Sequence, residues 1–172
     1  MSDTPPSNGI RFSISNLSDS TARLIPTVYQ SRAPISIYDA RFSGEQGSRT
    51  VIPADTIEEI IQSLKSFAHA CNAFKVPASN IRVLATEATR TAPNSIDFRD
   101  QIKTATGWTV ELLSKEDEGR IGALGVASSF PAPIKGLVLD LGGGSAQISW
   151  VRLDVGGTLQ RSSSAYLSLI HI

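Results

Sequence analysis

The sequence predicts an α/β protein in which a sheet and helices pack in layers. Three observations lead to this expectation. Apolar and polar residues alternate with the period of strands in the first third of the chain, and helical spacing then alternates with short buried-strand patterns in the middle. The composition agrees, because 41% of the 172 residues are apolar and 19% are charged, which is enough apolar material to bury a core.

The first third of the chain predicts strands. Residues 9–17 alternate apolar and polar side chains, as a half-buried strand does. Residues 22–30 and 33–42 have the pattern of further short strands, which prolines interrupt, and the glycine-rich residues 42–49 predict a loop. We therefore expect a sheet to begin almost at the start of the chain.

The middle of the chain predicts a helix, a buried strand and a second helix. A capping box that begins at Thr56 and apolar residues at helical spacing as far as Cys71 predict the first helix. The largely apolar residues 81–85 predict a buried strand. Residues 93–106 predict the second helix, which Gly107 is placed to terminate.

A third helix is predicted after another strand at residues 108–113. Ser114 and Asp117 resemble a capping box, so we expect the helix to begin there. The residues of this helix that we expect to face a core are Ile121, Leu124 and Gly125.

The sequence also predicts two domains. Residues 131–133, Pro-Ala-Pro, have the composition of a linker, and residues 137–141 after them predict another buried strand. We therefore expect one domain over residues 1–130, and a linker followed by the beginning of a second domain over residues 131–172.

Charge and composition narrow the class of function. The 16 basic and 16 acidic residues cancel, so the overall charge gives no reason to expect nucleic acid or a membrane surface as a partner. No apolar run approaches the roughly 20 residues of a membrane span, and Cys71 is the only cysteine, which excludes an internal disulfide. We expect a cytoplasmic protein.

Three consecutive glycines at residues 142–144 stand between the strand that contains Asp140 and the polar residue Ser145. The backbone N–H groups of such a run can converge on one anion. Glycine also supplies the positive φ that an ordinary hairpin turn needs. Spacing alone does not decide between a phosphate cradle and a plain turn, and the lysine of a P-loop is absent.

Four segments, in chain order, resemble the motifs of a known family. They are SNGIRFSI at residues 7–14, VLATEATRTAPNSIDF at 83–98, LLSKEDEGRIGALGV at 112–126 and VLDLGGGSAQISW at 138–150. In this order, they are similar to the first phosphate loop, the arginine segment, the acidic helix start and the second phosphate loop of one family. This is the exopolyphosphatase and guanosine pentaphosphate phosphohydrolase family, the Ppx/GppA phosphatases. The resemblance implies an actin-like ATPase (ribonuclease H-like) fold, in which two related domains each present a loop to phosphates.

The resemblance also implies roles for residues in the attack of water on a terminal phosphoanhydride. Glu118 matches the catalytic glutamate, which orients or deprotonates water, and Asp140 matches an aspartate that holds Mg²⁺ near the phosphates. The alternatives are a solvated charge near the helix start for Glu118, a turn former for Asp140 and an outward strand residue for Arg11. The positions that match phosphate-facing or phosphate-cradling residues are Ser7, Asn8, Gly9, Arg11, Arg90, Gly142, Gly143, Gly144 and Ser145.

The sequence departs from the family pattern in two respects. Gln147 stands where the family has a glutamate, and glutamine cannot act as a base or give a full negative charge to a metal ion. Residues 1–6, MSDTPP, lack the apolar strand and the aspartate that precede the first loop in the family. Because the chain also ends soon after the second loop, we expect a fragment with its first strand missing and its second domain truncated.

Two functions follow from these patterns. The first is Mg²⁺-dependent hydrolysis of a terminal phosphoanhydride of polyphosphate or guanosine pentaphosphate. The second is a non-catalytic sensor of nucleotide or polyphosphate that switches contacts with a signalling protein. Gln147 favours the sensor, and so does the first loop with Asn8, Gly9 and Arg11, which resembles the fungal branch of the family that acts in mitochondria-to-nucleus retrograde signalling.

Overall fold

A computed structural model of the protein describes residues 9–17, 26–42, 50–130, 134–141, 146–153 and 166–171. The chain divides into two compact units, Met1–Leu112 with Ser164–Ile172, and Leu113–Ser163. This division differs from the expected domain boundary at residues 130 and 131, because the helix that begins near residue 115 belongs to the same unit as the hairpin after it. None of the helices in the described ranges has the length and apolar content needed to cross a membrane.

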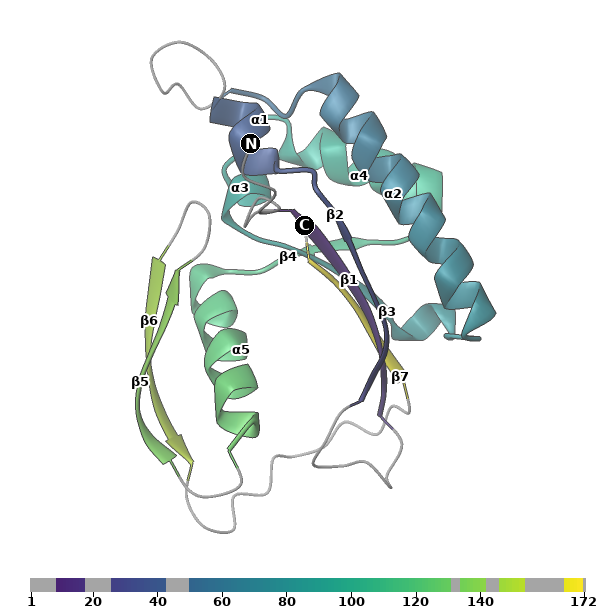
Figure 1. The fold of residues 1–172 in the computed structure, drawn as a ribbon. Helices are drawn as coiled ribbons and strands as arrows, with labels where there is room; N and C mark the ends of the chain where they lie inside the picture. The colour runs from purple at the N-terminus through teal and green to yellow at the C-terminus, as the bar shows by residue number, and fades with distance from the viewer. Residues whose placement is uncertain are drawn as a thin grey trace, which may run out of the picture. The chain divides into compact units, whose positions relative to one another are not determined.

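The first unit contains a five-stranded sheet (Figure 1). Its strands are β1 (Ile10–Asn16), β2 (Thr27–Ala33), β3 (Ile81–Ala85), β4 (Val110–Leu112) and β7 (Tyr166–His171). They lie in the order β2-β1-β7-β3-β4. β1 pairs antiparallel with β2 and β7, whereas β3 pairs parallel with β7 and β4. The strands predicted at the start of the chain and at residues 81–85 are therefore confirmed.

β7 is the last strand in the chain, yet it lies in the middle of this sheet. Phe12 of β1 is paired with Ile170, and Ile170 is paired with Val83 of β3. The sequence patterns above do not predict this strand. Its position matters because the backbone groups on the facing sides of β1 and β3 find their partners in β7, and backbone groups in a sheet interior must be paired.

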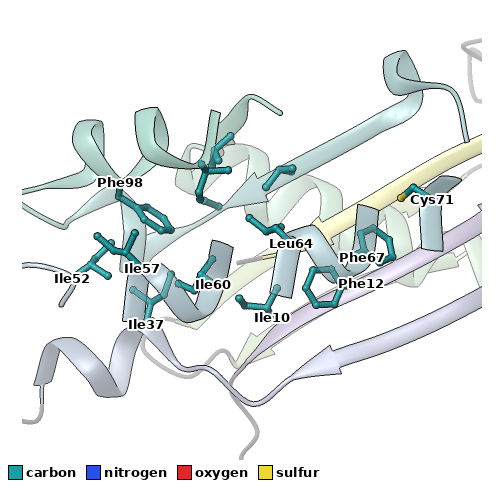
Figure 2. Packing of buried hydrophobic residues seen from close by; sticks show 14 of the residues in the cluster. Ile10, Phe12, Ile37, Ile52, Ile57, Ile60, Leu64, Phe67, Cys71 and Phe98 are labelled. Carbon is teal, nitrogen blue, oxygen red and sulfur yellow. The ribbon is translucent and has the colours of Figure 1, made fainter. Parts of the chain in front are cut away.

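The helices of the first unit are α1 (Ile37–Phe42), α2 (Ala54–Ala73), α3 (Glu87–Arg90) and α4 (Ser95–Thr106), with a 3₁₀ turn at Ala78–Asn80. Figure 1 shows α2 and α4 together on one side of the sheet. The core lies between them and the strands. Figure 2 shows one of its central contacts, the rings of Phe12 and Phe67, whose centroids are 4.7 Å apart. The amphipathic pattern that predicts α2 is thus confirmed by its buried face.

The strand predicted at residues 33–42 is wrong, because Ile37–Phe42 form α1. Ser36 explains the difference. Its side-chain oxygen accepts a hydrogen bond from the N–H of Asp39 at 3.1 Å, and its carbonyl accepts one from Ala40 at 3.0 Å. A serine in this position starts a helix by satisfying one of the first N–H groups. The loop predicted next falls mostly on residues 43–49, outside the described ranges.

The ends of the other helices in this unit agree only in part with the sequence. The capping box at Thr56 is wrong, because α2 begins two residues earlier and Pro53, which precedes it, makes no side-chain cap. The short helix α3 is not predicted by the patterns above. The terminator predicted at Gly107 is confirmed, since Gly107 has a left-handed φ of 76° and its N–H donates to the carbonyl of Lys103 at 2.8 Å.

The second unit consists of a helix and a hairpin. They are α5 (Lys115–Ser128), β5 (Ile134–Leu141) and β6 (Ala146–Leu153), and β5 and β6 pair antiparallel. The helix is predicted correctly, but its core-facing residues are not: Ile121 and Leu124 are 40% and 42% exposed. Ala123 and Ala127 are buried instead, so α5 packs through small side chains.

The strand predicted at residues 137–141 is confirmed as part of β5, but its predicted burial is wrong. Leu137 and Leu139 are 61% and 66% exposed. They lie opposite Trp150 and Ile148 of β6, which are also exposed. The outer face of this hairpin is therefore apolar.

The contact between Phe67 and Phe12 generates a prediction about stability. Phe67→Ala removes a 3% exposed ring that also lies near Tyr29 and Trp108, so it should lower the free energy of unfolding by about 3 to 5 kcal/mol. Phe130→Ala is the matched control, because Phe130 is 51% exposed. Urea denaturation followed by circular dichroism measures both. Equal losses for the two variants would contradict the packing described here.

Candidate functional site

The first unit brings three predicted phosphate-facing residues to one end of its sheet. Arg11 of β1 is paired with His171 of β7, and His171 is paired with Leu84 of β3. The beginning of β1, where Gly9 lies, and the end of β3 therefore meet at the same end of the sheet. Arg90 follows the end of β3 in the one-turn helix α3. The carboxyl ends of parallel strands are the usual place for ligands in α/β folds.

Gly9 is required by its close approach to β2. Its φ is 154°, and a Cβ at this position would lie 2.7 Å from the carbonyl oxygen of Ala33. No side chain fits there without displacing the backbone of β2. The glycine of the first loop therefore has a packing reason that is independent of phosphate. Ser7 and Asn8, predicted to belong to the same loop, lie outside the described residues.

Arg11 is exposed and lies opposite another arginine. Its partner in the ladder between β1 and β2 is Arg32, which is exposed as well. Directly opposite residues share one face of a sheet, and like charges in such a pair repel each other. An anion bound near Arg11 would lessen this repulsion. The alternative, an outward strand residue, describes the position of Arg11 equally well.

Arg90 has an acidic neighbour that the sequence patterns missed. Its Nη2 atom lies 2.6 Å from Oε2 of Glu87, and both side chains are about four-fifths buried, with exposures of 21% and 18%. The spacing of three residues on a helix is the signal that could have revealed this pair. Glu87 orients the guanidinium, so a phosphate that binds Arg90 must approach from another side or displace Glu87.

In the second unit, the start of α5 places Glu118. The side-chain oxygen of Ser114 accepts a hydrogen bond from the N–H of Asp117 at 3.0 Å, which confirms the predicted cap. The carbonyl of Ser114 accepts a hydrogen bond from the N–H of Glu118 at 2.9 Å. Glu118 thus lies in the first turn of the helix, and its Oε2 atom is buried. The alternative of a fully solvated charge does not fit this burial.

Asp140 lies against the same helix. A Cβ on Gly122 would be 3.5 Å from Oδ2 of Asp140, which is an ordinary van der Waals distance, so this carboxylate lies beside Gly122. Gly122 is four residues after Glu118, and residues four apart lie on one face of a helix. Ser149 of β6 also donates a hydrogen bond to the carbonyl of Gly119, at 3.2 Å. The structure therefore brings the carboxylates of Glu118 and Asp140 to one face of α5.

The glycine loop joins β5 to β6, but the residues that form it, Gly142, Gly143, Gly144 and Ser145, lie outside the described ranges. The two strands that flank this loop are paired, and Asp140 of β5 is the partner of Gln147 of β6. Gln147, the position at which the family has glutamate, is thus the cross-strand neighbour of Asp140.

The carboxylates of Glu118 and Asp140 provide only some of the ligands that a magnesium ion needs. Carboxylate oxygens are hard ligands, and Mg²⁺ is commonly held by one or two carboxylates together with water and substrate phosphates. Glu118 and Asp140 supply oxygens of this kind, and the carboxylate of Asp140 lies beside Gly122. Within the described ranges, no group of three or more His, Cys, Asp or Glu side chains could hold a metal ion. The fit therefore depends on phosphate oxygens completing the site.

A hollow of about 390 Å³ also lies between α5 and β6. Its lining includes Arg120, Trp150 and Arg152, but neither Glu118 nor Asp140. The hollow therefore does not coincide with the pair of carboxylates.

Comparison with known proteins gives matches over most of the chain. The sequence pattern described as the Ppx/GppA phosphatase family matches residues 17–166. Retrograde regulation protein 2 of Saccharomyces cerevisiae is 43% identical over 161 residues, which are 94% of this chain and 27% of the yeast protein. The chain thus spans about a quarter of the length of that relative.

Solved structures give the same result for the fold. The Ppx/GppA enzyme of Aquifex aeolicus is 29% identical with a TM-score of 0.70, over 85% of this chain and 46% of that one. An exopolyphosphatase-like protein is 26% identical with a TM-score of 0.67, over 84% of this chain and 42% of that one. An exopolyphosphatase from Cytophaga hutchinsonii, 19% identical with a TM-score of 0.65 over 92% of this chain and 47% of that one, shows the fold alone. The predicted actin-like α/β fold is confirmed.

The cap of α5 generates a prediction. Ser114→Ala removes the oxygen that accepts the hydrogen bond from Asp117, so it should lower the free energy of unfolding by about 1 kcal/mol. Ser66→Ala in the middle of α2 is the control, because the hydroxyl of Ser66 donates to the carbonyl of Gln62 within the same helix and alanine is the better helix former. Thermal unfolding followed by circular dichroism compares the two. A cap role is excluded if Ser114→Ala is as stable as Ser66→Ala.

Proposed function

The chain belongs to the Ppx/GppA phosphatase family, and from that premise we propose that it carries part of the active site of a phosphoanhydride hydrolase. The observation that supports this most directly is the position of Asp140 over Gly122, on the face of α5 that also carries Glu118. A pair of carboxylates, one to handle water and one to hold a cation, is what the hydrolysis of a polyanion needs.

In the proposed reaction, Glu118 orients a water molecule and accepts its proton. The water oxygen attacks the terminal phosphorus, the bond from that phosphorus to the bridging oxygen breaks, and the remaining chain leaves with the electron pair. The cap at Ser114 fixes the backbone of Glu118, so little reorientation is needed. When bound, Mg²⁺ would be held by Asp140 and would offset phosphate charge.

Arg11 and Arg90 are proposed to bind phosphate oxygens. Both lie at the end of the sheet where β1 begins and β3 ends. Guanidinium groups bind phosphate oxygens in pairs and stay charged at any physiological pH. The proposed substrates are polyphosphate and guanosine pentaphosphate, because both end in a phosphoanhydride that such a site can bind without reading a base.

A second candidate is a sensor that binds nucleotide or polyphosphate and passes the signal to a protein partner. Gln147 favours it, because the residue paired with Asp140 is a glutamine here and a glutamate in the family. The similarity to the yeast protein named Retrograde regulation protein 2 favours it too. The sensor keeps the phosphate contacts of the hydrolase and lacks turnover.

Phosphate release distinguishes the two functions. The 172-residue chain, alone and joined to the remaining sequence of the yeast relative, is assayed with Mg²⁺ on polyphosphate, guanosine pentaphosphate and ATP. For a hydrolase, Glu118→Gln should reduce release at least about a hundredfold, because a general base typically contributes that much. Glu116→Gln is the matched control, since Glu116 is an exposed acid in the same helical turn.

The sensor is supported instead if polyphosphate binds to both proteins but neither releases phosphate. In that case Gln147→Glu tests whether the missing carboxylate is the reason. Release by Gln147→Glu would identify residue 147 as the position at which turnover was lost. Absence of both binding and release would overturn the hydrolase and the sensor together.

The position of Gly122 beside Asp140 generates a separate prediction. Gly122→Leu adds a branched side chain whose Cβ already lies 3.5 Å from Oδ2 of Asp140, so it should crowd this carboxylate and weaken Mg²⁺-dependent binding of polyphosphate about tenfold. Gly125→Leu is the matched control on the same helix, because a Cβ there meets nothing within 4 Å. Isothermal titration calorimetry with polyphosphate, with and without Mg²⁺, measures both. Equal binding by the two variants would show that the place of Asp140 over Gly122 does not matter.

A further inference from the structure

Arg41 is a fully buried arginine that none of the sequence patterns singles out. It lies in the last turn of α1, and 0% of its surface is exposed. A buried guanidinium is costly unless its N–H groups are hydrogen-bonded. Nε of Arg41 donates to the carbonyl oxygen of Thr50 at 2.9 Å, which ties one side of the group to the segment before α2.

The other side of the guanidinium is directed at α3. Nη1 donates to the carbonyl of Ala88 and, at 3.0 Å, to the hydroxyl of Thr91. Nη2 donates to the carbonyl of Thr91 at 2.9 Å. The last carbonyl groups of a helix accept no hydrogen bond from an N–H group of the same helix. The helix dipole also favours a cation at this end. Arg41 therefore caps the C-terminal end of α3.

α3 needs such support, because it has only four residues and an isolated turn is unstable in water. Arg90 is its last residue, and it lies in the chain between Ala88 and Thr91, whose carbonyl groups Arg41 holds. The hydroxyl of Thr91 also donates to the carbonyl of Glu87 at 2.8 Å. Contacts of Arg41 thus reach the backbone on both sides of Arg90.

We propose that Arg41 is a positioning residue for Arg90. By holding the carbonyl groups on either side of Arg90, it sets the direction in which that guanidinium meets a phosphate. The inference rests on the proposed function and deepens it, because it gives a reason why a one-turn helix presents Arg90 in a fixed orientation. Arg41 is completely buried, so it acts through Arg90 and does not touch the phosphate itself.

Only arginine fits this role. A planar guanidinium can donate in several directions at once, here to Thr50 on one side and to α3 on the other. A lysine ammonium is a point charge that cannot span the same acceptors. Arg41→Lys therefore keeps the charge but loses the bridge, and it should behave like Arg41→Gln in the experiments below.

The first experiment is amide hydrogen exchange on the 172-residue chain. Arg41→Gln and Arg41→Lys should speed exchange in residues 87–92 by at least about tenfold while the amides of β3 change little. Arg82→Gln is the matched control, because Arg82 is an exposed arginine of the same unit whose pKa is raised by its hydrogen bond to Glu111. Unchanged exchange in residues 87–92 would overturn the positioning role.

Thr91→Val provides a milder variant, should the loss of Arg41 unfold the chain. It leaves Arg41 in place and removes one of its acceptors, together with the bond from Thr91 to Glu87. Exchange in residues 87–90 should then rise about threefold, less than for Arg41→Gln, since only part of the cap is lost. Exchange at the wild-type rate would count against the inference.

The second experiment is a double-mutant cycle on the Kd for polyphosphate. Arg41→Gln should weaken binding about tenfold in the wild-type chain and less than about twofold when Arg90→Gln is already present, because a residue that acts through Arg90 has no effect without it. Equal losses in both backgrounds would show a purely structural role and overturn the inference. If Arg90→Gln alone leaves the Kd unchanged, the proposed role of Arg90 fails, and the exchange data alone then decide whether Arg41 positions α3.

Discussion

The first unit depends on the pairing of β7 between β1 and β3. This strand is the last in sequence, and it supplies backbone partners to two strands that come from opposite ends of the unit. Because it runs antiparallel to β1 and parallel to β3, it brings the beginning of β1 to the end of β3. Gly9 and Arg11 thereby share one end of the sheet with α3 and Arg90. Without a strand in this place, β1 and β3 would each have an open edge in the middle of the sheet.

The second unit depends on small residues in α5. The carboxylate of Asp140 lies beside Gly122, and the carbonyl of Gly119 accepts a hydrogen bond from Ser149. Ala123 and Ala127 form the buried contact with the hairpin. The hairpin can approach the helix closely because these side chains are short. The larger side chains Ile121 and Leu124 are not part of this buried contact, and each is about two-fifths exposed.

The sequence predicts well what local chemistry determines. The strand period in β1, the apolar face of α2, the serine cap of α5 and the left-handed Gly107 each follow from residues close together in the chain. Helix α1 was missed because Ser36, its capping residue, follows a proline-containing stretch that alternates like a strand. Arg41 and β7 have roles set by partners about 50 or more residues away, which no local pattern contains. The proposed roles of Glu118 and Asp140 rest on the family resemblance, and no local pattern contains the place of Asp140 beside a helical glycine.

The register of the hairpin determines which residue is paired with Asp140, and the charge of that residue bears on the two proposed functions. Asp140 is paired with residue 147 across the hairpin, so a glutamate in the sequence there would give this pair two acidic residues beside the proposed polyanion site. Such a pair repels the phosphates unless a divalent cation neutralises it, which links binding to the metal. Glutamine at this position makes the charge of the hairpin less negative by one unit than glutamate would. Gln147 therefore takes one potential cation ligand away from the hairpin, a loss that weighs more on the proposed hydrolase than on the proposed sensor.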